Sequence, residues 1–119
     1  MKAGRELDAL VAEKVFGQKL FRGAVVYGNW SPQDDGYDGY VCDVPRYSTD
    51  IAAAWKVVEQ LETGTDDDLP MLIHLFQDCD RWKCCVHLQY DHILMATAWE
   101  DTAPLAICIA ALKAKGVDV

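Results

Sequence analysis

The pattern of apolar and polar positions divides the chain into three helical segments and one stretch of alternating residues. Apolar side chains recur at helical spacing in residues 6–16, 48–62 and 103–115, so each segment is predicted to form a helix with a buried face. The last segment is apolar almost all round, which predicts that it is the most buried of the three helices.

Polar residues in the first two helical segments are assigned to the polar face of the first helix and to the cap of the second. In the first segment Leu7 and Val11 belong to the apolar stripe, whereas Asp8 is assigned to the polar face. The second helix is predicted to begin at Ser48 and Thr49, because a hydroxyl there can accept hydrogen bonds from free backbone N–H groups.

Residues 71–99 change to a period of two, which indicates β-strands. The runs 71–77, 82–90 and 93–99 are separated by short turn segments, so they are predicted to form an antiparallel meander. The middle run carries polar side chains on its second face, where a sheet covered on both sides should be apolar. That face is therefore expected to be partly open, or to line a cavity or a subunit contact; its residues are Lys83, Cys85, His87 and Gln89.

The segment from residue 18 to residue 45 is rich in glycine and tyrosine and has no long periodicity. Only residues 24–27 are predicted as a short strand, and residues 30–43 are predicted as a loop. The fold class is therefore α+β: an antiparallel sheet, made of a three-stranded meander with room for a fourth short strand, sandwiched by three helices. Residues 1–119 are expected to form a single α-β-α sandwich domain.

Charge and composition narrow the possible partners. Lys and Arg number 11 against 19 Asp and Glu, giving a net charge of −8, and the basic residues are scattered, so extended nucleic acid is an unsuitable ligand. No apolar run reaches the ~20 residues of a membrane span and no signal-peptide core is present, so the protein is expected to be cytoplasmic. The five cysteines are odd in number and irregularly spaced, which predicts reduced thiols without a disulfide.

No arrangement of residues predicts catalysis, a metal or a cofactor. The cysteines and histidines between residues 74 and 92 include no Cys-x-x-Cys or Cys-x-x-His pair that could begin a zinc site. Cys85 and His87 share a strand face, but their side chains project in parallel and no third orienting group is indicated. The chain is therefore expected not to be an enzyme.

One segment combines features of an anion-binding site. The free N–H groups at the start of the second helix, two hydroxyls and a guanidinium can bind a phosphate, and nearby aromatic rings can stack on a base. The competing interpretation of Ser48 and Thr49 is simple helix capping. The candidate ligand-binding residues are Arg46, Tyr47, Ser48, Thr49 and Trp30.

Three blocks of the chain resemble a known family. Residues 5–17 (RELDALVAEKVFG), 46–59 (RYSTDIAAAWKVVE) and 102–114 (TAPLAICIAALKA) are similar to the small phage and prophage proteins that contain the phage ABA sandwich domain. The resemblance implies a helix–sheet–helix sandwich and a phage or prophage origin. It supplies no catalytic motif, and residues 18–45 match no pattern of the family.

The resemblance suggests where such a protein acts. The primary hypothesis is a non-enzymatic phage protein, in the cytoplasm of the host bacterium, that sequesters a nucleotide-type immune signalling molecule. The alternative is an antagonist that binds a basic host protein through the acidic residues of 34–43 and 66–68. A homodimer is expected in either case, because the apolar last helix and the mixed face of the sheet leave surplus surface to bury.

Overall fold

A computed structural model describes residues 1–33, 38–64 and 69–119 of the chain. The acidic run 66–68 and part of the acidic stretch 34–43 lie outside the described residues. The elements follow in the order α1 (Arg5–Lys14), β1 (Lys19–Phe21), β2 (Ala24–Gly28), β3 (Gly39–Asp43), α2 (Ile51–Thr63), β4 (Met71–Asp78), β5 (Arg81–Leu88), β6 (Leu94–Glu100) and α3 (Ala103–Ala114).

Strands β4, β5 and β6 form the predicted antiparallel meander. The β4–β5 register runs without interruption from Met71 opposite Leu88 to Asp78 opposite Arg81. The β5–β6 register shifts after Val86, which marks a bulge. The clean alternation in residues 82–90 thus predicted both the central strand and its two faces.

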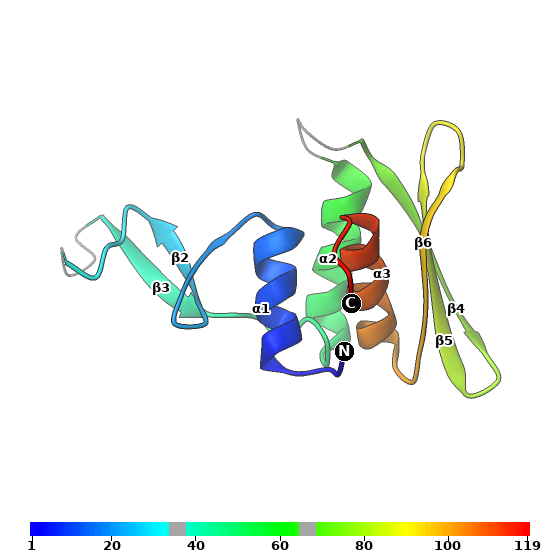
Figure 1. Cartoon of the computed structure of the whole chain (residues 1–119), viewed down its shortest axis with the longest axis horizontal. Helices are drawn as coiled ribbons and strands as arrows, with labels where there is room; N and C mark the ends of the chain where they lie inside the picture. Colours follow the sequence, from blue (N-terminus) through cyan, green and yellow to red (C-terminus); the bar gives the residue numbers. More distant parts are fainter. Residues whose placement is uncertain (34–37, 65–68) are drawn as a thin grey trace.

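The three helices all lie on one side of this sheet (Figure 1). Helix α3 packs against β5 and β6, α2 packs against α3 and β4, and α1 packs behind α3. Nine residues of α3 are buried, so its apolar surface is covered within the chain itself, as expected for the most buried helix. The core between helices and sheet includes Cys84 and Val86 of β5.

The segment predicted as a loop contains a second sheet, which corrects that prediction. Strands β1, β2 and β3 form a three-stranded antiparallel sheet, and β3 occupies the end of the predicted loop 30–43. The glycines there are not strand breakers. A Cβ on Gly39 would collide with the Tyr27 carbonyl and the Trp30 amide, so glycine permits this close approach. We call residues 19–33 and 38–43 the arm, since they extend away from the helices in Figure 1.

The α+β class with three helices is confirmed, but the layers differ from a sheet with helices on both faces. The helices lie between the arm and the β4–β6 sheet (Figure 1). The outer face of the β4–β6 sheet is left uncovered by the described residues. In the described ranges, no helix is long and apolar enough to span a membrane.

Candidate functional site

The start of α2 differs from the prediction that a hydroxyl of Ser48 or Thr49 caps it. The N-cap is Asp50, whose carboxylate accepts a hydrogen bond from the Ala52 N–H at 3.0 Å. A carboxylate at this position is also stabilised by the positive end of the helix dipole. The free N–H groups that an anion would use are therefore already facing an acidic side chain.

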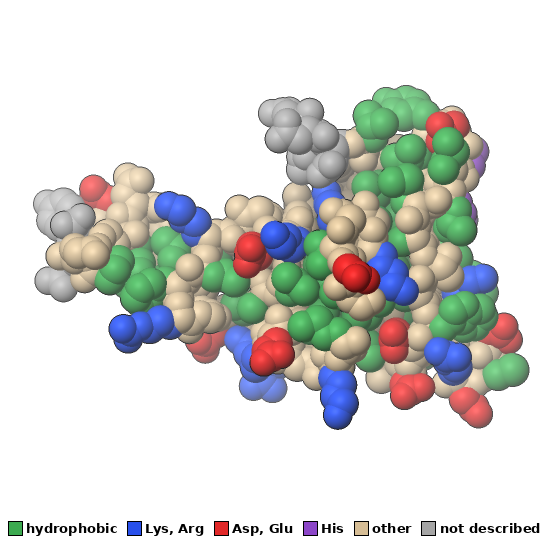
Figure 2. Space-filling model, viewed as in Figure 1, with side chains coloured by type: hydrophobic (Ala, Val, Ile, Leu, Met, Phe, Trp, Pro, Cys, Tyr) green, Lys and Arg blue, Asp and Glu red, His purple; other side chains and the backbone are tan. Residues whose placement is uncertain are grey.

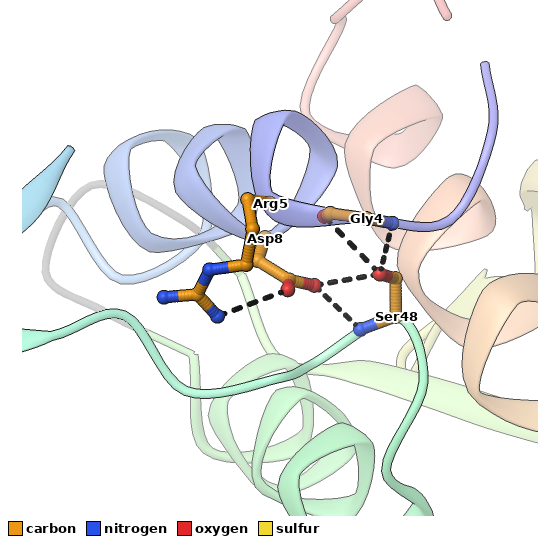
Figure 3. A network of polar contacts seen from close by, with 4 residues as sticks. All are labelled: Gly4, Arg5, Asp8 and Ser48. Atoms are coloured by element: carbon orange, nitrogen blue, oxygen red, sulfur yellow. Dashed lines mark hydrogen bonds and ion pairs between the residues drawn. The ribbon is translucent and has the colours of Figure 1, made fainter.

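Ser48 is fully buried and is bonded to the carboxylate of Asp8 (Figure 3). The Ser48 N–H donates to Asp8 Oδ1 at 2.8 Å and the Ser48 hydroxyl donates to the same oxygen at 2.6 Å. The hydroxyl oxygen also accepts a hydrogen bond from the Gly4 N–H at 3.0 Å. On the other side, Arg5 lies 3.4 Å from Asp8 Oδ2. Ser48 thus joins the start of α1 to the segment that leads into α2.

The two aromatic residues of the predicted site are also occupied. Tyr47 is buried and stacks on Phe16 with ring centroids 5.1 Å apart. Burial raises the pKa of Tyr47 to about 12, with smaller contributions from nearby groups such as Asp8. Trp30 belongs to the arm, where it packs against Phe21 at 4.9 Å.

The five predicted residues therefore do not form one site in this structure. Arg46 and Thr49 are exposed, but Tyr47 and Ser48 are buried and Trp30 packs within the arm. The sequence did contain part of the evidence that Asp8 is buried. Asp8 lies three, four and seven residues before apolar positions, which places it on the edge of the apolar stripe rather than opposite to it.

The uncovered outer face of the β4–β6 sheet, which we call the open face, groups chemically distinctive side chains. Residues directly opposite one another in antiparallel strands point to the same side, so the registers define rows of three across the sheet. The rows are Phe76–Lys83–Trp99, His74–Cys85–Thr97 and Leu72–His87–Leu94. The polar second face expected from the sequence is thus present and has no helix over it, although Cys85 itself is buried.

The first row places a lysine between two aromatic rings. Lys83 Nζ lies 5.6 Å from the Phe76 ring centroid and 4.9 Å from the Trp99 ring centroid. Arg81 lies beside the row, with its guanidinium carbon 5.8 Å from the Trp99 centroid. Basic and hydrophobic side chains adjoin one another over β4 and β5 in Figure 2. Phe76 and Trp99 are 44% and 36% exposed, so their rings remain accessible.

The next two rows bring histidines together beside a thiol. The rings of His74 and His87 meet edge to face at 5.4 Å. The Thr97 hydroxyl donates to Cys85 Sγ at 3.9 Å. The Nδ1 atom of His87 is buried and has no hydrogen-bond partner among the described residues. Within those residues no group of three or more His, Cys, Asp or Glu is arranged to hold a metal ion.

Comparisons with known proteins give one family and one similar structure. The sequence model of the phage ABA sandwich domain matches residues 9–112. The 2.0 Å crystal structure of a phage protein from Bacillus cereus ATCC 14579 is similar, with a TM-score of 0.66 and 26% sequence identity. That alignment covers 96% of this chain and 92% of the Bacillus cereus chain. No curated protein matches the sequence.

Proposed function

The chain belongs to the phage ABA sandwich domain family, and on that premise we propose that it is a non-enzymatic protein that sequesters a nucleotide-type host immune signalling molecule. The ligand is a small, phosphorylated molecule with an aromatic base. The phage context suggests a host signal as the molecule to be captured.

The observation that carries the proposal is the Phe76–Lys83–Trp99 row on the open face. Two accessible rings, on the strands that flank β5, offer flat surfaces for a base, and base–aromatic stacking contributes about 1–3 kcal/mol per base. Lys83 sits between the rings at cation–π distances, so its ammonium is already positioned beside the stacking surface. Stacking and phosphate recognition can therefore occur at one place.

The charge distribution supports a small ligand over a long one. Arg81 and Lys83 lie on the same strand of an otherwise acidic protein with a net charge of −8. Two cations suit one or two phosphates, whereas a polynucleotide needs a stripe of basic residues along its backbone. The site we propose replaces the one predicted at residues 46–49, where Arg46 and Thr49 are exposed but Tyr47 and Ser48 are buried.

A direct test is titration calorimetry against a panel of cyclic dinucleotides, cyclic oligonucleotides and cyclic ADP-ribose isomers. Lys83→Gln removes the charge between the rings and Trp99→Leu removes one stacking surface. Loss of a charge-assisted contact of ~1.5–3 kcal/mol corresponds to a roughly ten- to hundred-fold loss of affinity. Lys56→Gln, at an exposed lysine of α2, is the control for the change in net charge.

Arg46→Gln tests the original location in the same assay. We expect Arg46→Gln and Lys56→Gln to bind like the wild type, with Lys83→Gln and Trp99→Leu weakened. The reverse pattern would return the site to the start of α2. Native mass spectrometry of the complex should release the ligand with unchanged mass, and a changed mass would contradict the non-enzymatic part of the proposal.

The alternative hypothesis, capture of a basic host protein, gives a different result. In that case no nucleotide of the panel binds, and a host protein is retained by the wild type. Its retention would weaken in high salt, because contacts between an acidic surface and a basic one are screened.

A further inference from the structure

We infer that the exposed edge of β3 pairs with β3 of a second copy of this chain, joining two arms into one continuous antiparallel sheet. This contact uses the arm and leaves the open face free, so it does not depend on the proposed ligand site. The sequence predicted a dimer partly from the apolar last helix, but α3 is covered within its own chain. The edge of β3 is a different surface.

Side chains of the same chain bond to the backbone of two of the four sheet edges, at two carbonyls of β6 and at the first carbonyl of β4. On β6, Arg81 donates to the Trp99 carbonyl at 2.9 Å and Lys113 donates to the Thr97 carbonyl at 3.5 Å. On β4, the Gln89 amide donates to the Met71 carbonyl at 3.3 Å. Such contacts occupy the backbone groups that would otherwise pair with another strand.

The two edges of the arm differ from each other. β1 has three residues and begins with Lys19, and both short length and lysine discourage edge pairing. β3 has five residues, Gly39–Asp43, with no lysine and no proline. No side chain of the described residues is bonded to the β3 backbone, and Tyr40 and Val41 are 58% and 39% exposed. The backbone of β3 is thus free of side-chain bonds from the described residues along its whole length, so this edge can accept a strand.

The direction of the backbone groups on β3 follows from the turn between β1 and β2. Arg22 and Gly23, with φ angles of 50° and 78°, form a two-residue turn, so Phe21 and Ala24 are a hydrogen-bonded pair. Hydrogen-bonded and non-bonded pairs alternate along an antiparallel ladder. The backbone groups of Ala24 and Val26 in β2 therefore bond to β1, and those of Val25 and Tyr27 bond to β3.

The β3 residues opposite Val25 and Tyr27 are Cys42 and Tyr40, so their backbone groups point toward β2. The Asn29 N–H donates to the Asp38 carbonyl at 3.2 Å, which fits the same alternation at the end of the hairpin. The backbone groups that point away from the sheet therefore belong to Gly39, Val41 and Asp43.

One two-fold symmetric register lets the backbone groups of all three residues form hydrogen bonds with the second copy. If the axis passes through Val41, Val41 pairs with Val41 of the second copy, and Gly39 of each copy pairs with Asp43 of the other. A two-fold axis makes the contact self-complementary, as closed dimers require. It also sets each Asp43 opposite a glycine rather than opposite a like charge, which matters in a chain with a net charge of −8.

The shape of the molecule favours this contact. The radius of gyration is 15.1 Å, whereas a compact domain of this length has about 13.5 Å. The difference reflects the arm, which extends from the helices and presents its edge at one end of the longest axis (Figure 1). Two arms can therefore approach without a clash between the helical bodies.

The first test measures the mass in solution by light scattering at high micromolar concentration. The wild type is expected to be a dimer. Val41→Lys sets two charges opposite each other at the axis and should give a monomer. Met95→Lys is the matched control, since Met95 is 41% exposed at the edge of the other sheet, and it should remain a dimer. Circular dichroism checks that both variants are folded.

The second test is disulfide trapping in a background that lacks the exposed thiols Cys42 and Cys79. Residues in a hydrogen-bonded antiparallel pair have Cα atoms about 5.5 Å apart, within the range for a disulfide, so Val41→Cys should crosslink two copies on oxidation. Tyr40→Cys should crosslink poorly, because its equivalent in the second copy lies on the diagonal at roughly 7–8 Å. A monomeric wild type, or a dimer that survives Val41→Lys, would overturn the inference.

Discussion

Replacing Ser48 with alanine tests whether this residue forms a buried hydrogen-bond network with Asp8 or only caps α2, because the two roles predict different losses of stability. The change removes the 2.6 Å hydrogen bond to Asp8 and the acceptor for the Gly4 N–H. Asp8 is 1% exposed, so water cannot replace the lost donor. Its other contacts are the Ser48 N–H and the longer contact with Arg5.

The expected cost follows from these contacts. A hydrogen bond to a charged group contributes about 1.5–3 kcal/mol, and the unpaired Gly4 N–H adds to this, so Ser48→Ala should cost about 2–4 kcal/mol. For a domain of this size that corresponds to a fall in Tm on the order of 10 °C. Loss of a simple helix cap would cost only ~1 kcal/mol.

Urea denaturation followed by circular dichroism measures this difference. Thr49→Ala is the control, because Thr49 is the exposed neighbour and its loss should change the free energy of unfolding by less than about 0.5 kcal/mol. A double-mutant cycle with Asp8→Ala should give a coupling energy of about 0.5–3 kcal/mol. A cost of ~1 kcal/mol or less for Ser48→Ala, with no coupling to Asp8, would refute the buried network as a source of stability.

Three other expectations follow from the structure. Burial raises the pKa of Tyr47 from 10.0 to about 12, so the unfolded chain loses this proton first and stability should fall between pH 10 and 12; Tyr47→Phe should flatten that fall in urea titrations. A thiol reagent should label Cys42 and Cys79 rapidly and the buried cysteines slowly, and equal rates for all thiols would contradict the described burial. Gly39→Ala introduces a Cβ against backbone atoms of the arm, so proteolysis within residues 19–43 should become faster than in the wild type.

The sequence predicted the parts of the fold that depend on local periodicity. The β4–β6 meander and the three helices each bury one face, and burial on one face leaves a repeating pattern of apolar residues. The open face was likewise visible as alternating polar residues such as Lys83 and His87. The aromatic residues that flank Lys83 come from two other strands, so their grouping required the register between strands.

The arm and the Asp8–Ser48 network could not be predicted in the same way. The arm strands β1 and β3 have three and five residues, too few to show a period, and glycines at close approaches imitate turn signals. The hydrogen bond from Ser48 to Asp8 joins residues 40 positions apart, and a polar residue before a helix predicts capping when only its neighbours are considered.

The bond between Asp8 and Ser48 has a consequence for how the arm can change in length. It fixes the point at which the chain returns to the helical body after the arm, close to where α1 began. The two ends of the intervening segment are thus held close together, and doubling the length of such a loop costs only about 0.6 kcal/mol in closure entropy. A change of length in the hairpin between β2 and β3 should therefore be tolerated, whereas a linker in place of the whole arm would remove Val25 of β2, which is fully buried in the core shared with α1, α2 and α3.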